Sequence, residues 1–188
     1  MSKSEMNLCD RKYLKKILLF EGWAPRQLAA FSNLASSVFE TNELSTKEKE
    51  LIAMGCAHSL KCAYCIDYHI SLAQQAGAGK EDIAETAWIG IFVAGKASFL
   101  AGKKIIELIP DDEVIGTVLD EPLNKCEQSF EASENMKNLK QFEHVTLSPK
   151  NIDSALAKLV ALARAQSCHS VELAKEFAIL GAKDGCTK

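Results

Sequence analysis

The chain has 188 residues, of which 47% are hydrophobic and 25% charged, so it is long enough to bury a core as one domain or two small ones. Its formal net charge of −3 argues against nucleic acid or an anionic membrane surface as a main partner. No apolar run reaches the length of a membrane span.

The seven cysteines are an odd set and lack the spacing of a secreted disulfide framework, so they indicate a reducing compartment. The apolar run at residues 17–20 is too short for the hydrophobic segment of a signal peptide. We therefore expect a soluble cytoplasmic protein. The cysteines are Cys9, Cys56, Cys62, Cys65, Cys126, Cys168 and Cys186.

Two helices are predicted before residue 40. The first covers about Asp10 to Phe20, with Gly22 as its stop. Pro25 can occupy the first position of the second helix, because its missing N–H would be unpaired there in any case. We expect both helices to cover the elements that follow them. The buried face of the second helix is predicted to be Leu28, Phe31, Leu34 and Val38.

A third helix has a well-defined predicted start. The residues Ser45-Thr46-Lys47-Glu48 have the sequence of a capping box, in which the serine accepts an early backbone N–H and the glutamate reaches back. The helix carries Glu50, which taken alone is best interpreted as a solvated partner of the helix dipole. Glu50 could approach His69 only if this helix and the next pack as an antiparallel hairpin.

The centre of the chain has a pattern that favours thiol chemistry. Cys62 and Cys65 are three residues apart, and His69 follows four residues later, so a helix would place all three on one face. The Cα atoms of residues i and i+3 lie about 5 Å apart, which permits a disulfide. We expect Cys62 in the first turn, where free N–H groups favour a thiolate. Because His69 could hold a proton for Cys65, Cys65 is the better candidate nucleophile and Cys62 the better resolving partner.

The spacing of Glu50, Cys62, Cys65 and His69 resembles that of the AhpD-like alkylhydroperoxidases of the carboxymuconolactone decarboxylase superfamily. The signature of that group is a glutamate twelve residues before a Cys-x-x-Cys and a histidine four residues after it. The resemblance is clear over residues 45–108 and faint elsewhere. It implies an all-helical oligomer whose cysteine pair reduces peroxides or exchanges disulfides.

The resemblance also implies a role for each of these side chains. Cys65 would attack the peroxide, and Cys62 would then form the disulfide. His69 and Glu50 would form a proton relay to the thiols. Some members carry a second histidine between the cysteines, and this chain departs from them by having Tyr64 there.

Two other interpretations of the cysteines remain open. A Cys-x-x-Cys with a nearby histidine is also a zinc pattern, and His58 or Cys56 could supply a fourth ligand. Structural zinc sites, however, usually draw their ligand pairs from two separate segments. The cysteines could also simply pack in a core, because free cysteine is among the most buried residue types.

The helix of the cysteine pair is expected to span about Lys61 to Ala76 and to exit through Gly77 and Gly79. The longest periodic segment follows, up to about Leu108. Glycine weakens a helix interior by roughly 1 kcal/mol, so its row of small residues is expected where another helix comes close. That neighbour could belong to the same chain or to a second subunit. The small residues are Gly90, Gly95, Ala97, Ala101 and Gly102.

We expect residues 1–110 to form the AhpD-like catalytic helical domain and residues 111–188 a helical C-terminal extension. Residues 121–143 are polar and charged and predict a connecting helix or a partly mobile arm. When residue 147 is aligned with residue 44, a few identities follow, which suggests that the extension contains a degenerate second repeat.

That alignment has a consequence for the chemistry of the extension. Cys168 falls on Cys65, but Ala165 replaces Cys62, and Glu172 stands where the first copy has its histidine. The second copy would therefore lack the redox chemistry and would only complete the core.

The sequence thus predicts an all-α protein with an AhpD-like helical fold, in which a central antiparallel helix hairpin carries the Cys-x-x-Cys. The predicted function is a thiol-dependent peroxidase or disulfide reductase that requires no metal, flavin or haem. An external dithiol protein must regenerate the pair, and the resemblance implies a thioredoxin-like or lipoyl-bearing one, as well as a homo-oligomer. The alternatives are a carboxymuconolactone-decarboxylase-like enzyme, which would not need the cysteines, and a non-catalytic metal-binding protein.

Overall fold

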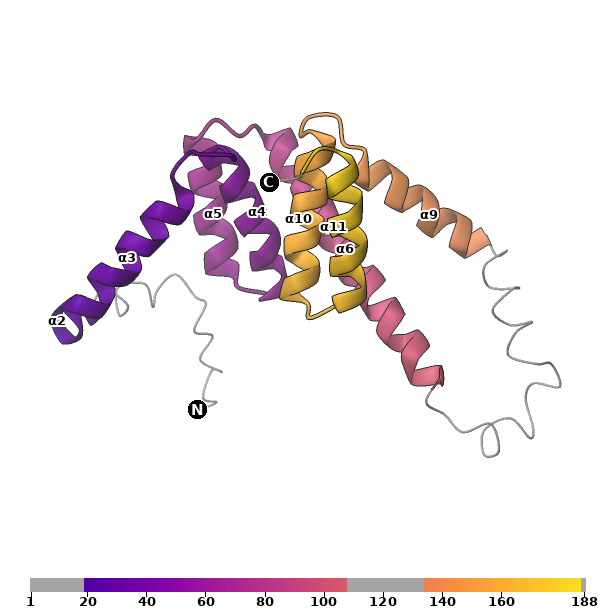
Figure 1. Ribbon diagram of the computed structural model, residues 1–188, viewed down its shortest axis with the longest axis horizontal. Helices are drawn as coiled ribbons and strands as arrows, with labels where there is room; N and C mark the ends of the chain where they lie inside the picture. The colour runs from indigo at the N-terminus through magenta and orange to yellow at the C-terminus, as the bar shows by residue number, and fades with distance from the viewer. Residues whose placement is uncertain (1–18, 108–133, 187–188) are drawn as a thin grey trace, which may run out of the picture.

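The computed structural model describes residues 19–107 and 134–186, and these residues form eight α-helices and no strand (Figure 1). The predicted all-α fold is confirmed. Within these ranges no helix combines the length and the hydrophobicity needed to cross a bilayer. Most of the first predicted helix, at about Asp10 to Phe20, lies outside the described residues. The helices are α2 (Phe20–Trp23), α3 (Pro25–Phe39), α4 (Thr46–Ser59), α5 (Ala63–Gln75), α6 (Lys80–Glu107), α9 (Glu134–Leu147), α10 (Ser154–Ser167) and α11 (Val171–Lys183).

Helices from both halves of the chain share one hydrophobic core. Helix α4 packs on α5, α6 and α10, and α10 in turn packs on α6 and α11 (Figure 1). Leu51 and Phe92, from α4 and α6, belong to the same buried cluster as Val160 and Phe177, from α10 and α11. The C-terminal helices therefore supply part of the core that supports α4 and α5.

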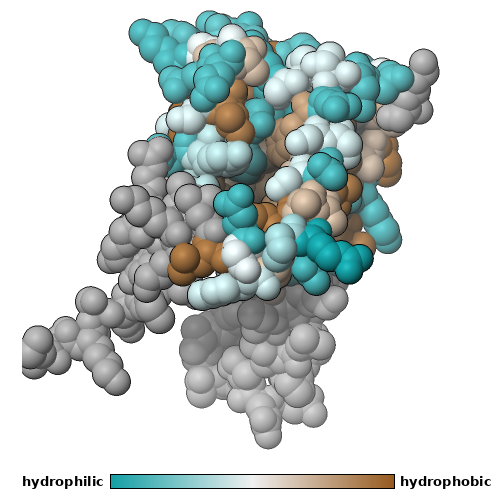
Figure 2. All heavy atoms as spheres, turned by 90° about the vertical axis from the view of Figure 1, so that its left-hand side faces the viewer, coloured by the Kyte–Doolittle hydropathy of each residue, from teal (hydrophilic) through white to brown (hydrophobic). Residues whose placement is uncertain are grey.

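Helix α3 begins at Pro25 as predicted, but the prediction that it buries its apolar face is wrong. None of its residues is buried, and Phe31, Leu34 and Val38 are 67%, 62% and 52% exposed. The helix meets the body at its C-terminal end and extends away from it (Figure 1). Figure 2 faces this side and shows hydrophobic residues at the surface among polar ones. Helical periodicity identifies an apolar face, but it does not say what covers that face.

The short helix α2 corrects a second prediction. Gly22 lies inside α2, whose last residue is Trp23, instead of ending a helix. In the C-terminal half, part of the polar segment 121–143 is helical, because α9 begins at Glu134. The ring of Phe142 packs edge-on against Phe92 at 5.6 Å, so this part of the segment joins the body.

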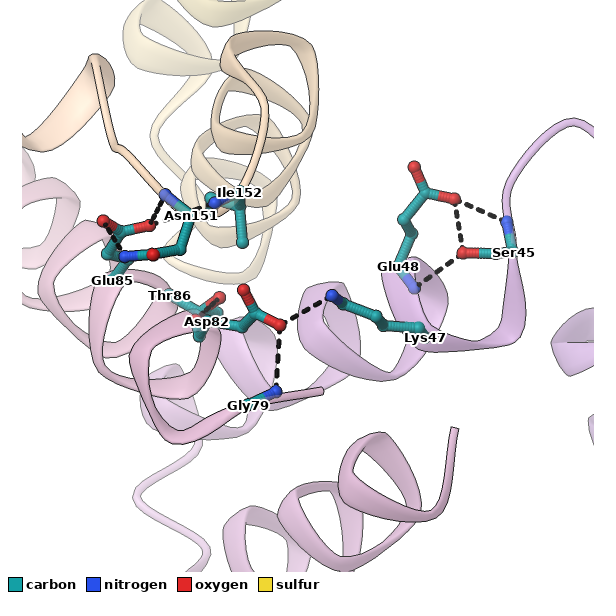
Figure 3. A network of polar contacts seen from close by, with 9 residues as sticks. All are labelled: Ser45, Lys47, Glu48, Gly79, Asp82, Glu85, Thr86, Asn151 and Ile152. Carbon is teal, nitrogen blue, oxygen red and sulfur yellow. Dashed lines mark hydrogen bonds and ion pairs between the residues drawn. The ribbon is translucent and has the colours of Figure 1, made fainter. Parts of the chain in front are cut away.

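Helix α4 starts where the sequence predicts. The Ser45 hydroxyl accepts the Glu48 N–H at 3.3 Å, and the Glu48 carboxylate accepts the Ser45 N–H at 2.6 Å, which confirms the capping box (Figure 3). Lys47 in the first turn is 2.6 Å from the carboxylate of Asp82, which also accepts the Gly79 N–H at 3.0 Å (Figure 3). These bonds tie the start of α4 to the start of α6.

Glu85, one turn further along α6, holds the loop between α9 and α10. Its carboxylate accepts the backbone N–H groups of Asn151 and Ile152 at 2.9 and 3.1 Å (Figure 3). It also accepts the N–H of Lys150 at 2.9 Å. Burial opposes the charge, but these hydrogen bonds outweigh it and lower the pKa of Glu85. The loop that leads into α10 is thus fixed on α6.

The pair α10–α11 matches the pair α4–α5 element by element when residue 154 is aligned with residue 46. In both pairs 14 residues are followed, after a three-residue turn, by 13. Both turns hold one residue at positive φ, Lys61 at 50° and His169 at 56°. The register suggested by the sequence differs from this one by five residues, because it aligned residue 147 with residue 44. In the structural register Ser170 corresponds to Cys62 and Phe177 to His69; a common origin of the two pairs stays a prediction.

The row of small residues on α6 lets another helix of the same chain come close at Gly90 but not at Gly95. A Cβ added at Gly90 would lie 2.8 Å from Nδ1 of His58 on α4, whereas one added at Gly95 would meet nothing within 4 Å. We expect Gly90→Ala to lower the free energy of unfolding by roughly 1–3 kcal/mol, because the half-buried His58 imidazole must move. Gly95→Ala should raise it by up to about 1 kcal/mol, through helix propensity. Chemical denaturation of both variants checks the difference in sign, and equal effects would contradict this packing.

Asp82 should make the stability depend on pH. Burial alone would raise its pKa, but the hydrogen bonds from Lys47 and Gly79 and the charge of Lys47 hold the pKa below its usual value. A lowered pKa stabilises the folded state above about pH 4, and this contribution is lost as the pH falls through the folded-state pKa. Asp82→Asn should therefore cost about 1–3 kcal/mol at pH 7 and much less at pH 3, as measured by urea denaturation. The control is Glu81→Gln, because the Glu81 side chain is 53% exposed and 3.7 Å from Lys80.

Candidate functional site

The two cysteines of the central motif form a disulfide at the start of α5. Cys62 is the N-cap residue, one position before the helix, and its Sγ accepts the Cys65 N–H at 3.2 Å. The Cα atoms of the two cysteines are 5.3 Å apart, and the disulfide between them is closed. Cys62 is only 6% exposed, whereas Cys65 is partly exposed. The more exposed of the two residues is therefore Cys65.

Glu50 and His69 meet across the α4–α5 pair. The Glu50 Oε2 lies 2.7 Å from the His69 Nδ1, although the two residues are far apart in the sequence. Glu50 is 3% exposed, so the interpretation of this residue as a solvated partner of the helix dipole does not hold. A buried carboxylate is stable only with a close hydrogen-bonding partner, and His69 provides it. The contact is possible because α4 and α5 pack against each other.

This contact determines which imidazole nitrogen is not engaged by Glu50. The Glu50 carboxylate engages Nδ1, so Nε2 is the nitrogen left to exchange a proton with another group. His69 follows Cys65 by four residues on α5, and residues with this spacing are neighbours on one helix face. The four residues that the sequence singles out thus lie on two neighbouring helices and the turn between them, with Glu50 bonded to His69 and Cys62 bonded to Cys65.

Aromatic rings surround the imidazole. Phe39, the last residue of α3, stacks on His69 with the ring centroids 5.8 Å apart and the planes 23° apart. Tyr68 meets His69 edge-on at 5.4 Å, and Tyr64 stacks on Tyr68 at 5.9 Å. The sequence gives no indication of the contact of Phe39, because it depends on how α3 meets α5. Tyr64, which stands between the two cysteines, is part of this aromatic row.

The proposed fourth zinc ligands, His58 and Cys56, do not join the cysteine pair. In residues 19–107 and 134–186 no three His, Cys, Asp or Glu side chains are placed to hold a metal ion. The buried Nδ1 of His58 has no hydrogen-bond partner and faces Gly90. Burial, and then the charge of Arg164, lower the pKa of His58, so its imidazole is neutral at pH 7.

Cys168 lies apart from the redox pair, in the turn between α10 and α11. Its Sγ accepts a hydrogen bond from Arg164 Nη1 at 2.8 Å and is 3.9 Å from the Ser59 hydroxyl. The neighbouring His169 is exposed, as expected for a surface residue. Glu172, which the sequence alignment pairs with His69, is exposed as well.

The structure also has an apolar pocket of about 320 Å³ between α6, α9 and the loop after α9. None of the four residues predicted for the redox site lines it. Its lining residues are Glu85, Trp88, Phe142, Val145, Thr146, Ser148, Pro149 and Lys150.

The sequence was compared with those of known proteins. The model of the carboxymuconolactone decarboxylase family matches residues 25–108, which include α3 to α6 and all four candidate site residues. The chain is also similar to a protein of Paracoccus denitrificans described as "Uncharacterized protein 4 in cox locus". The two are 32% identical over 87 residues, which cover 46% of this chain and 77% of that protein. No solved structure matches the chain.

Proposed function

Because the chain belongs to the carboxymuconolactone decarboxylase family, which includes AhpD-like proteins, we propose that it is a thiol-dependent peroxidase or disulfide reductase. One observation carries the proposal: the Cys62–Cys65 disulfide lies one helical turn from an imidazole that a buried carboxylate holds. A thiol with a base one turn away, itself oriented by a third group, is the general arrangement of an activated nucleophile.

In the proposed peroxidase cycle the Cys65 thiolate attacks the distal oxygen of a hydroperoxide. The O–O bond breaks, Cys65 becomes a sulfenic acid, and the departing alkoxide takes a proton to leave as an alcohol. The Cys62 thiol then attacks the sulfenic sulfur, which forms the disulfide and releases water. This order of events is supported by the exposure of the two residues, since Cys65 is partly exposed and Cys62 is buried.

His69 and Glu50 supply the protons in this cycle. His69 accepts the proton of the Cys65 thiol and returns it to the leaving oxygen, and Glu50 stabilises the imidazolium between these steps. Because Glu50 is almost fully buried, its charge acts on the imidazole with little screening by solvent. The relay needs no base at the position of Tyr64.

An external dithiol must reduce the disulfide after each turnover. A thiolate of the reductant attacks one sulfur of the Cys62–Cys65 disulfide to form a mixed disulfide, and the second thiol of the reductant resolves it. We propose a thioredoxin-like or lipoyl-bearing protein in this role, and a cytoplasmic location in which such dithiols are kept reduced. As a disulfide reductase, the protein would make this exchange in the opposite direction. A thiolate of the reduced pair attacks a disulfide of the substrate, and the other cysteine of the pair resolves the mixed disulfide.

A second candidate activity is that of a carboxymuconolactone-decarboxylase-like enzyme, because the matching family carries that name. Such a reaction does not need the cysteine pair. Lactone turnover that survives in a Cys65→Ser protein would favour it.

We expect the reduced protein to lose two thiols on brief exposure to peroxide, as counted by thiol titration and intact mass. The Cys62→Ser variant should accumulate a trappable sulfenic acid, and Cys65→Ser should not react at the pair. Glu50→Gln should slow the reaction by roughly 10²–10⁴-fold, the range typical of general acid–base groups.

The free cysteines Cys168 and Cys186 provide matched controls for this experiment. Their serine variants should retain the reaction of the pair at the wild-type rate. Thiols at positions 62 and 65 that stay reduced in the presence of peroxide would exclude the peroxidase cycle.

We also propose that the protein is a homo-oligomer, in line with the resemblance, and that the apolar face of α3 contributes to the subunit contact. Phe31 and Leu34 on this helix are 67% and 62% exposed, and a helix of this length is marginally stable without packing.

Light scattering after gel filtration should give more than one chain for the wild type and a smaller mass for the double variant Phe31→Glu, Leu34→Glu. The matched control, Ser32→Glu with Ser36→Glu, adds the same charge on the same helix and should keep the wild-type mass. A monomeric wild type would contradict the proposal.

A further inference from the structure

The orientation of the His69 ring is not determined by its own helix. The outermost torsion of a histidine side chain is broad, so the backbone of α5 leaves the plane of the imidazole free to turn. The hydrogen bond to Glu50 holds one ring atom, Nδ1, at 2.7 Å, but the ring can still tilt about that point. A relay that uses both nitrogens needs the plane to be fixed as well.

Phe39 provides a surface that fixes this plane. Its ring lies against the face of the imidazole, at 5.8 Å between centroids and 23° between planes. Tyr68 touches the ring at its edge, but Tyr68 precedes His69 on α5 and is 46% exposed. Phe39 comes from a different helix and is only partly exposed, so it forms a wall that does not move with α5.

The position of Phe39 is itself fixed by α4. The Thr46 hydroxyl donates to the Phe39 carbonyl at 2.9 Å, and the Lys49 ammonium donates to the carbonyls of Val38 and Glu40 at 2.7 and 2.6 Å. Thr46 and Lys49 stand at the beginning of α4, next to Glu50. The N-terminal end of α4 therefore positions both Glu50, which holds Nδ1 of His69, and Phe39, whose ring lies against the plane of the imidazole.

We propose that Phe39 is a positioning residue for the redox site: it restrains the His69 imidazole so that Nδ1 stays on Glu50 while Nε2 serves the cysteine pair. The helix α3, which is otherwise exposed, thereby has a function at its C-terminal end. The catalytic part of this inference rests on the proposed function, whereas the restraint on the imidazole does not depend on it.

The test compares Phe39→Leu with the wild type, both with the cysteine pair reduced. The rate at which peroxide removes the two thiols should fall roughly three- to tenfold, the range that the loss of one ring–ring contact supplies. In NMR spectra the wild type should show one set of His69 imidazole signals, and Phe39→Leu should show broadened or doubled signals. Phe39→Tyr, which keeps the stacked ring, should restore both properties.

Trp88→Leu is the control, because it removes a ring contact, with Phe142 at 6.1 Å, outside the redox site. It should leave the peroxide rate and the His69 signals unchanged. If Phe39→Leu does not fold, Thr46→Val replaces it as the variant, since it removes the hydroxyl that holds the Phe39 carbonyl. Thr46→Val should then disturb the same His69 signals.

The outcomes separate this inference from the proposed function. A Phe39→Leu protein with the wild-type rate and a single set of His69 signals would overturn the positioning role. A wild-type protein that does not react with peroxide would overturn the peroxidase cycle alone, because the His69 signals of the variants would still decide on Phe39. Loss of rate in Trp88→Leu equal to that in Phe39→Leu would also overturn the inference, since the effect would then not be specific to His69.

Discussion

The bond between Glu50 and His69 is the constraint on which the arrangement of the site depends. A carboxylate that is 3% exposed is strongly unfavourable unless a donor reaches it, and the donor is 2.7 Å away on the neighbouring helix. The bond joins α5 to α4, which also pack together along their length. Since Cys65 and His69 are four residues apart on α5, they lie on the same face of that helix, and Cys65 is therefore on the side of α5 that carries the bond to Glu50.

The capping box sets where this assembly begins. Ser45 and Glu48 determine the first residue of α4, and the next turn carries Lys49 and Glu50, one towards α3 and the other towards α5. A shift of one residue in the start of α4 would turn these side chains by about 100° around the helix axis. The capping residues of α4 therefore determine the direction of Glu50, which lies within two turns of them and contacts His69.

The parts of the structure that depend on local spacing could be predicted from the sequence. These include the all-α fold, the start of α4 at Ser45 and the grouping of Cys62 and Cys65 in one turn. Each follows from residues at most a few positions apart. The meeting of Glu50 and His69 could be anticipated only as a condition, because it requires two helices to pack in one particular way.

The parts that depend on long-range packing could not be predicted. The apolar stripe of α3 is real, but periodicity alone could not show that Phe31 stays exposed while Phe39 stacks on His69. The register between the two helix pairs was missed for a related reason. Few identical residues connect them, and the match is carried by helix lengths and by the positive φ of Lys61 and His169, which the side chains do not reveal.

The matched turns have a consequence for how the redox pair works. Ser170 takes the same backbone conformation, φ −90° and ψ 95°, that Cys62 takes at φ −89° and ψ 94°, and Ser170 has no disulfide. This turn conformation therefore does not require a sulfur–sulfur bond. The backbone at Cys62 can therefore keep the same φ and ψ when the disulfide is reduced, so that opening the sulfur–sulfur bond requires no change in the turn.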